Sequence, residues 1–176
     1  MDRTDSFEKS KIFKAATNKV ITNVYCDSFP IEKVKFQNAN FAEKKSIFCY
    51  VDFSVIARMA ADLTTGRFFK VIEEDKYHRY TVSLGGSKRD GTITSRRMFV
   101  AVSGDKVFIN MEQGPGKENE TGAIIPAGEA EKIGVPMDKD TFREMILYTH
   151  DWITAYLGPM VHKLVKEVQE ERKSAS

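Results

Sequence analysis

RMFVAVSGDKVFINME, residues 97–112, consists of two runs of alternating side chains on either side of Gly104-Asp105. A Gly-Asp pair tolerates positive φ and suits the two-residue loop of a β-hairpin. If Ser103 pairs with Lys106, one face of the hairpin is uniformly apolar. That face pairs Val102 with Val107, Val100 with Ile109 and Met98 with Met111. The stretch therefore predicts an antiparallel hairpin with a defined register and one core face.

The opposite face of this hairpin mixes aromatic rings with cationic and hydrogen-bonding groups. It carries Arg97, Phe99, Ala101 and Ser103 opposite Glu112, Asn110, Phe108 and Lys106. Aromatic and basic groups interleaved on a sheet suit the stacked bases and phosphates of single-stranded nucleic acid. The alternative is that a helix or a second subunit covers Phe99 and Phe108.

Two neighbouring segments extend this polar and aromatic surface. In the strand expected at 79–84, Arg79 points away from the apolar side chains, and the glycine-rich loop that follows adds further cations. Residues 46–52 also alternate, so Phe48 and Tyr50 are either buried or part of the same aromatic face. The candidate nucleic-acid-binding residues are Phe48, Tyr50, Arg79, Lys88, Arg89, Arg96, Arg97, Phe99, Lys106 and Phe108.

Composition fits one soluble domain, because 41% of the 176 residues are hydrophobic and 30% are charged. The net charge of +2 is far from that of a strongly basic nucleic-acid binder, so any electrostatic footprint is expected to be local. Cys26 and Cys49 stand apart without metal-ligand spacing, which favours reduced thiols and an intracellular compartment. No apolar run is long enough to cross a bilayer and the first residues lack a signal-peptide core, so we expect a cytoplasmic protein with no membrane contact.

The remaining segments predict alternating strands and helices. Residues 1–20 suit a short helix or a flexible basic arm, 21–32 a broken strand or loop around Pro30, and 33–38 a strand. Helical spacing predicts a helix at 54–64, capped by Ser54 or Asp52 and ended by Gly66. Residues 67–78 fit a helix or a strand, and we favour a strand or irregular segment. Residues 113–134 read as a long mobile loop with a short strand at 123–125.

The C-terminal region predicts the longest helix of the chain. Asp138 is a suitable N-cap, and one apolar stripe follows at helical spacing, formed by Phe142, Met145, Ile146, Thr149, Trp152, Ile153 and Tyr156. Gly158-Pro159 is expected to interrupt this helix. A second amphipathic segment then carries Met160, Val161, Leu164, Val165 and Val168, and it suits packing within the chain or dimerisation.

Residues 79–158 resemble the C-terminal part of Whirly-type and related transcriptional-coactivator single-stranded-DNA-binding domains. The resemblance rests on the order of strands, the hairpin FVAVSGDKVFINME, a loop, and then IGVPMDKDTFREMILYTHDWITAYLGP. It implies a strongly bent antiparallel sheet backed by helices, with single-stranded nucleic acid across the exposed sheet and frequent oligomerisation. The helix expected at 54–64 and the long glycine-rich loop depart from this pattern.

Catalytic and cofactor sites find little support in the sequence. His78, His150 and His162 lack the further ligands that a metal site needs, and neither GGSK nor GPGK has the spacing of a nucleotide P-loop. Cys49 has no basic neighbour that would activate it as a nucleophile. We therefore expect no enzyme, no metal and no cofactor.

Together these features predict an α+β domain at residues 21–158, with a curved antiparallel sheet backed by helices and a long C-terminal amphipathic helix. Residues 1–20 form a basic arm or short helix in this division, and 159–176 form a C-terminal helix and tail. The expected function is binding of single-stranded DNA with little sequence preference, RNA being possible as a ligand, in a homo-oligomer formed through the C-terminal helix. The alternative is a non-enzymatic interaction or structural module that uses the same aromatic face for oligomerisation or partner binding.

Overall fold

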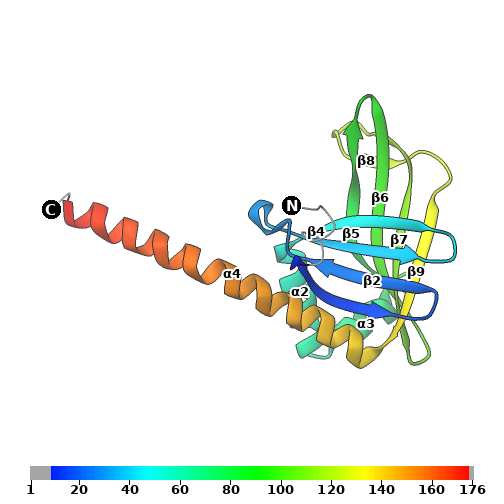
Figure 1. The fold of residues 1–176 in the computed structure, drawn as a ribbon, viewed down its shortest axis with the longest axis horizontal. Coiled ribbons are helices and arrows are strands. Elements are labelled where there is room, and N and C mark those ends of the chain that lie inside the picture. Colours follow the sequence, from blue (N-terminus) through cyan, green and yellow to red (C-terminus); the bar gives the residue numbers. More distant parts are fainter. Residues whose placement is uncertain (1–8, 175–176) are drawn as a thin grey trace.

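A computed structural model describes residues 9–174 and shows two antiparallel sheets with helices along one side (Figure 1). The first sheet is a meander in chain order, β1 (Lys11–Ala16), β2 (Val20–Tyr25), β3 (Lys33–Asn40) and β4 (Lys45–Asp52). A short 3-10 helix, η1 (Phe29–Ile31), joins β2 to β3. β1 and β4 are thus the two edges of this sheet.

The second sheet is built around the hairpin from which the sequence analysis began. Its strands are β5 (Arg79–Arg89), β6 (Thr92–Ser103), β7 (Lys106–Glu118), β8 (Ile124–Pro126) and β9 (Glu131–Asp138). β6 lies between β5 and β7, while β9 and β8 pair with successive parts of β7. The predicted register is confirmed, since Ser103 pairs with Lys106 and Met98 with Met111.

The core lies between the inner faces of the two sheets, whose strands cross each other in Figure 1. Val34 and Phe36 of β3 and Val100 and Ile109 of the hairpin are fully buried there. The Nδ2 group of Asn38, also on β3, donates hydrogen bonds to the carbonyl oxygens of Ile109 and Ile133 at 2.8 and 3.0 Å. This buried amide joins the sheets directly and satisfies polar groups that water cannot reach.

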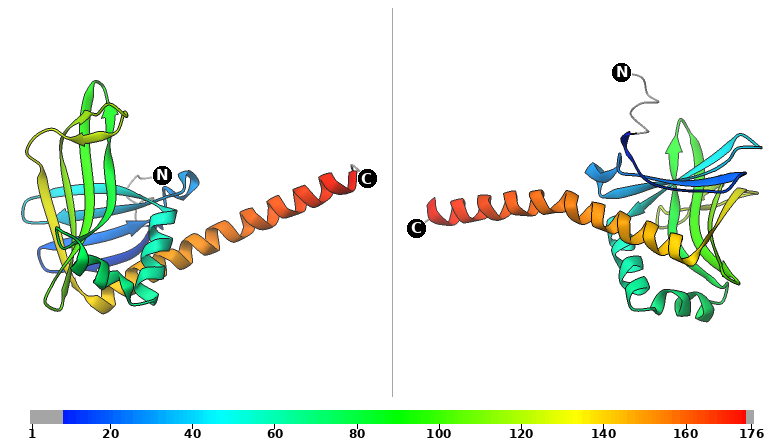
Figure 2. Two further views of the ribbon diagram at one scale, coloured as in Figure 1. Left: turned by 180° about the vertical axis from the view of Figure 1, so that it is seen from behind. Right: turned by 60° about the horizontal axis from the view of Figure 1, so that its bottom comes forward.

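Three α-helices pack along one side of the sheets, as the views in Figure 2 show. They are α2 (Phe53–Thr64), α3 (Arg67–Glu74) and α4 (Lys139–Ser174). The predicted caps of α4 and α2 are confirmed in position: Asp138 accepts a 2.7 Å hydrogen bond from the Thr141 backbone N–H, and Asp52 immediately precedes α2. The expected α+β class, with curved antiparallel sheet backed by helices, is confirmed.

Four expectations about individual segments are wrong. Residues 11–16 form β1 rather than a helix or arm, whereas residues 1–8 of the expected arm lie outside the described part of the chain. Residues 67–74 form α3, because Phe68 and Ile72, four residues apart, are both buried on one helical face. Within the loop expected at 113–134, residues 113–118 extend β7 and residues 131–134 begin β9.

The fourth error concerns α4, which runs through Gly158 and Pro159 without a break. Its first half covers the core with Phe142, Met145, Ile146 and Ile153, whereas Trp152 points outward and is 42% exposed. Its second half projects away from the sheets (Figures 1 and 2). The side chain of Val168, predicted on its apolar stripe, lies outside the described part.

Within residues 9–174, none of the helices is both long and apolar enough to cross a lipid bilayer.

Candidate nucleic-acid interface

The structure distributes the ten predicted site residues over several surfaces instead of one. Arg79, Arg97, Phe99, Lys106 and Phe108 lie on the outer face of the second sheet. Phe48 and Tyr50 lie on the outer face of the first sheet, and Lys88 and Arg89 lie at the end of β5 where it turns into β6. Arg96 points to the opposite side of the second sheet from Arg97, because successive side chains of a strand alternate between faces.

On the outer face of the second sheet, Arg79 lies between two aromatic rings. The centre of its guanidinium is 4.9 Å from the ring centroid of Phe99 and 4.9 Å from that of Tyr77. Tyr77 is 64% exposed and precedes β5. A cation–π arrangement of this kind fixes the direction of the guanidinium and leaves its edge accessible.

The neighbouring Arg97 is engaged differently. Its guanidinium forms an ion pair with Glu112, which is directly opposite on β7, and Lys132 of β9 lies 3.2 Å from the other oxygen of the same carboxylate. Glu112 is almost fully buried. A buried carboxylate needs both partners, so Arg97 stabilises the sheet and has little charge left for a phosphate group.

The cations at the β5–β6 turn are also paired. Lys88 contacts Glu118 at 3.2 Å, and Arg89 contacts Asp90 at 3.6 Å with both side chains about 90% exposed. Exposed pairs of this kind contribute little to stability and exchange readily for another anion. Lys88 and Arg89 can therefore bind an anionic ligand if each gives up one weak ion pair.

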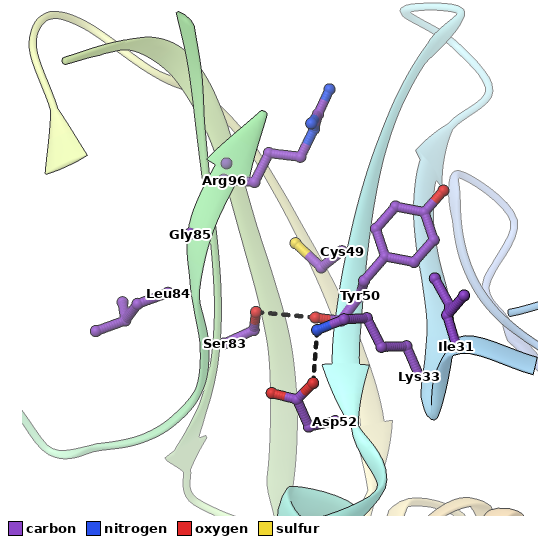
Figure 3. A pocket seen from close by; sticks show the side chains of 10 residues that line it. Ile31, Lys33, Cys49, Tyr50, Asp52, Ser83, Leu84, Gly85 and Arg96 are labelled. Carbon is purple, nitrogen blue, oxygen red and sulfur yellow. Dashed lines mark hydrogen bonds and ion pairs between the residues drawn. The ribbon is translucent and has the colours of Figure 1, made fainter. Parts of the chain in front are cut away.

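Tyr50 and Arg96 come together at a cleft between the two sheets. The cleft has a volume of about 360 Å³ and lies between β4, an edge of the first sheet, and β5, an edge of the second. Figure 3 shows the Tyr50 ring on one wall and the Arg96 side chain on the other. A hydrogen bond of 3.1 Å from the Ser83 hydroxyl to the Tyr50 carbonyl oxygen links the two strands.

The walls of the cleft combine an oriented charge with an exposed aromatic ring. Nε of Arg96 donates to Gln113 at 2.7 Å and one terminal nitrogen donates to Ser87 at 2.8 Å, which leaves the other terminal nitrogen without a hydrogen-bond partner among the described residues. The ring of Tyr50 is 45% exposed, whereas the exposed side chain of Leu84 on β5 points away from the cleft (Figure 3). The cleft thus offers an oriented guanidinium opposite an accessible ring.

Cys49 lines the cleft, but its thiol is not activated as a nucleophile. The side chain is almost fully buried, and its Sγ lies 3.6 Å from the carbonyl oxygen of Arg97 as a weak donor. Burial raises the pKa of the thiol to about 12, outweighing the opposite effect of the nearby Arg96 charge. Cys49 is therefore protonated at neutral pH.

Sequence reasoning missed several residues of these surfaces. Tyr77 lies in the turn before β5, where His78 has a positive φ, and its ring reaches Arg79 through this turn, which no strand or helix period indicates. Lys35 lies over the ring of Phe48, with Nζ 5.5 Å from the centroid, which is an adjacency across strands that no local pattern gives. Arg58 and Arg67 lie on helices α2 and α3, and the second of these was expected to be a strand or irregular segment.

Comparison with known families finds no family model that matches this chain, and comparison with curated proteins finds no matching sequence. Among the residues that the structure describes, no three His, Cys, Asp or Glu side chains are grouped as metal ligands.

Proposed function

We propose that this protein binds single-stranded nucleic acid, single-stranded DNA with little sequence preference in the first place, through the cleft between β4 and β5. The observation that carries the proposal is the pairing of an exposed ring, Tyr50, with an oriented guanidinium, Arg96, across an open cleft (Figure 3). A base stacks on an aromatic ring whatever its identity, and a guanidinium binds phosphate oxygens. This combination favours binding without sequence specificity.

The open strand edges support the same function. β4 and β5 are the terminal strands of their sheets on either side of the cleft, so their outward backbone N–H groups have no strand partner in the described sheets. Backbone N–H groups of this kind are donors for phosphate and sugar oxygens. Bases in a duplex are already stacked, so a ring that projects into a cleft selects unpaired strands.

The outer face of the second sheet provides the second part of the proposed interface. Phe99 and Phe108 are half-buried there, with Arg79 stacked on Phe99 and the exposed Lys106 at the start of β7. These residues suit additional stacking and phosphate contacts beyond the cleft. Phe48, beside Tyr50 on the same face of β4, belongs to the proposed interface as well.

The test is fluorescence anisotropy with labelled single-stranded DNA, duplex DNA and single-stranded RNA of one sequence. We expect the single strands to bind more tightly than the duplex at low salt. Removing the ring in Tyr50→Ala should weaken binding by about 1–3 kcal/mol, the usual contribution of one stacked base. Phe41→Ala is the matched control, because Phe41 is 54% exposed but precedes the other end of β4. Absence of binding at low salt, or equal losses in both variants, would overturn the proposal.

A second candidate function is self-association through α4, which would make the protein a homo-oligomer. The projecting half of α4 exposes Met160, Val161, Leu164 and Val165, each by 48% or more. Four large apolar side chains over two turns form an unusual surface for an isolated helix in water and fit a helical partner of the same kind. This observation also supports the alternative of an interaction module, with α4 rather than the aromatic face as the contact.

Light scattering after size-exclusion chromatography tests this association. We expect the wild-type protein to exceed the 20.0 kDa of one chain, and Leu164→Glu to elute as a monomer. Lys166→Glu is the control: it introduces the same side chain two positions further on, which in an α-helix is nearly the opposite side. A monomeric wild-type protein, or dissociation in both variants, would exclude α4 as the contact.

We also propose that the protein acts in the cytoplasm. Cys26 and Cys49 are both free thiols, and a reducing compartment keeps them so.

A further inference from the structure

A second cavity lies at the junction of α2, α3 and the start of β5, apart from the cleft that carries the proposed function. Its volume is about 310 Å³. Three arginines line it, and each comes from a different element: Arg58 from α2, Arg67 from α3 and Arg79 from β5. Neither of the two helix arginines, Arg58 and Arg67, was among the predicted site residues, whereas Arg79 was.

A buried tyrosine orients the first arginine. Nε of Arg58 donates to the hydroxyl oxygen of Tyr80 at 3.1 Å, and that hydroxyl donates to Asp62 at 3.0 Å. Burial, reinforced by the bond to Asp62, raises the pKa of Tyr80, so its hydroxyl keeps its proton at neutral pH. With Nε occupied, the terminal nitrogens of Arg58 make no hydrogen bond to any described residue.

The other two arginines are available in different ways. Arg79 is held between the rings of Tyr77 and Phe99, so its direction is fixed by stacking rather than by a carboxylate. The side chain of Arg67 is 73% exposed and has a loose contact of 3.9 Å with Asp62. It can therefore turn toward the cavity when an anion arrives.

Two carboxylates also line the cavity, and both already have donors. Asp62 accepts from Tyr80, and Asp75 accepts from the backbone N–H groups of Tyr77 and Arg79 at 2.8 and 3.3 Å. Three guanidinium groups therefore face two carboxylates that other groups satisfy, and the cavity keeps an excess positive charge. Guanidinium groups in such an arrangement bind the oxygens of a phosphate in preference to a compact neutral ligand.

We infer that this arginine-lined cavity binds the terminal phosphate of a nucleic-acid strand, with the end base stacked on the rings beside Arg79. A terminal phosphomonoester carries a charge of about −1.5 to −2 and three strong acceptor oxygens, whereas a phosphodiester within the chain carries a single charge. The three guanidinium groups that line this one cavity match the charge of the terminal phosphomonoester. The inference rests on the proposed binding of single strands and adds recognition of a strand end.

The test compares three oligonucleotides of one sequence, with a 5′-phosphate, with a 3′-phosphate, and with hydroxyl groups at both ends. We expect one phosphorylated form to bind the wild-type protein about tenfold more tightly than the hydroxyl form. A tenfold difference corresponds to the contribution of about one hydrogen bond to a charged group. Arg58→Gln and Arg67→Gln should reduce that preference to within about twofold. Arg67 is largely exposed, so its variant tests the site without threatening the fold; Arg143→Gln, on the exposed side of α4, is the matched control.

The two proposals fail in different ways. Equal binding of all three oligonucleotides to the wild-type protein, or a preference that survives in both variants, would overturn the phosphate site and leave the cleft untouched. Binding of the phosphorylated form alone, lost in Arg58→Gln and Arg67→Gln but retained in Tyr50→Ala, would support the phosphate site and overturn the cleft.

Discussion

Two consecutive arginines of β6 have opposite surroundings. Arg97 is neutralised by the buried carboxylate of Glu112, whereas Arg96 is held by the neutral Gln113 and Ser87 and keeps its charge at the cleft. The strand alternation that separates them is evident from the sequence. The partners, however, come from other strands: Glu112 of β7 pairs with Arg97, whereas Gln113 of β7 and Ser87 of β5 hold Arg96. Because only Arg96 keeps an uncompensated charge, it is the one that can bind a phosphate group.

Gly85 and Gly86 provide a residue-scale prediction with a built-in control. A Cβ added at Gly86 would lie 2.0 Å from the carbonyl oxygen of Thr94 and 2.7 Å from a methyl carbon of Ile124, whereas a Cβ at Gly85 meets nothing within 4 Å. Gly86→Ala should therefore lower the free energy of unfolding by about 1–3 kcal/mol, the usual effect of overpacking. Gly85→Ala should change it far less. Urea denaturation of the two variants measures the difference, and similar values would contradict the close contact between β5, β6 and β8.

At the scale of elements, sequence patterns succeed where the environment is simple. The β6–β7 register followed from Gly104-Asp105 and one apolar face, and α4 began where Asp138 suggested. β9 was missed because Gly134 and Pro136 usually interrupt strands. In the structure β9 is an edge strand, and Gly134 leaves room for the Asn110 side chain, to which an added Cβ would come within 2.7 Å.

The N-terminus of α4 predicts a pH-dependent contribution to stability. Hydrogen bonds from the backbone N–H of Thr141 first, and then from its hydroxyl, lower the pKa of Asp138 below its usual 3.8. A pKa that is lower in the folded state contributes stability above the unfolded pKa, and this contribution disappears as the pH falls through the folded value. Asp138→Asn should therefore be less stable than wild type at pH 6, with a smaller difference at pH 3. Asp105→Asn, in the hairpin turn, is the control, and a difference independent of pH would exclude the capping charge as the cause.

At the scale of the molecule, a net charge of +2 conceals an uneven distribution of available cations. The residue types of the candidate site could be predicted, since Tyr50 and Arg96 line the cleft and Arg79 lines the second cavity. Its assembly could not be predicted, because the cleft forms where the edges of two separate sheets meet. The single continuous face expected from the hairpin is divided in the structure between the two sheets and their junction.

Salt dependence separates the contributions of charge and stacking to binding. Arg96→Gln should make the plot of log affinity against log salt shallower by roughly 0.7, the counterions released by one contact to a single strand. Tyr50→Ala should lower affinity at every salt concentration with nearly the same slope as wild type, since stacking releases no counterions. Arg143→Gln should change neither quantity. Equal slopes in the Arg96 and Tyr50 variants would show that Arg96 contacts no phosphate.

Because α4 continues without a break past Pro159, its C-terminal half determines how far apart two associated copies would lie. At 1.5 Å per residue, the 159–174 half of the helix extends roughly 24 Å as a stiff rod. Two copies joined along this rod would keep their clefts apart and open, and would present both to one flexible strand. Once the first cleft is occupied, the second meets the same strand at a high local concentration, so the pair would hold long strands far better than short ones.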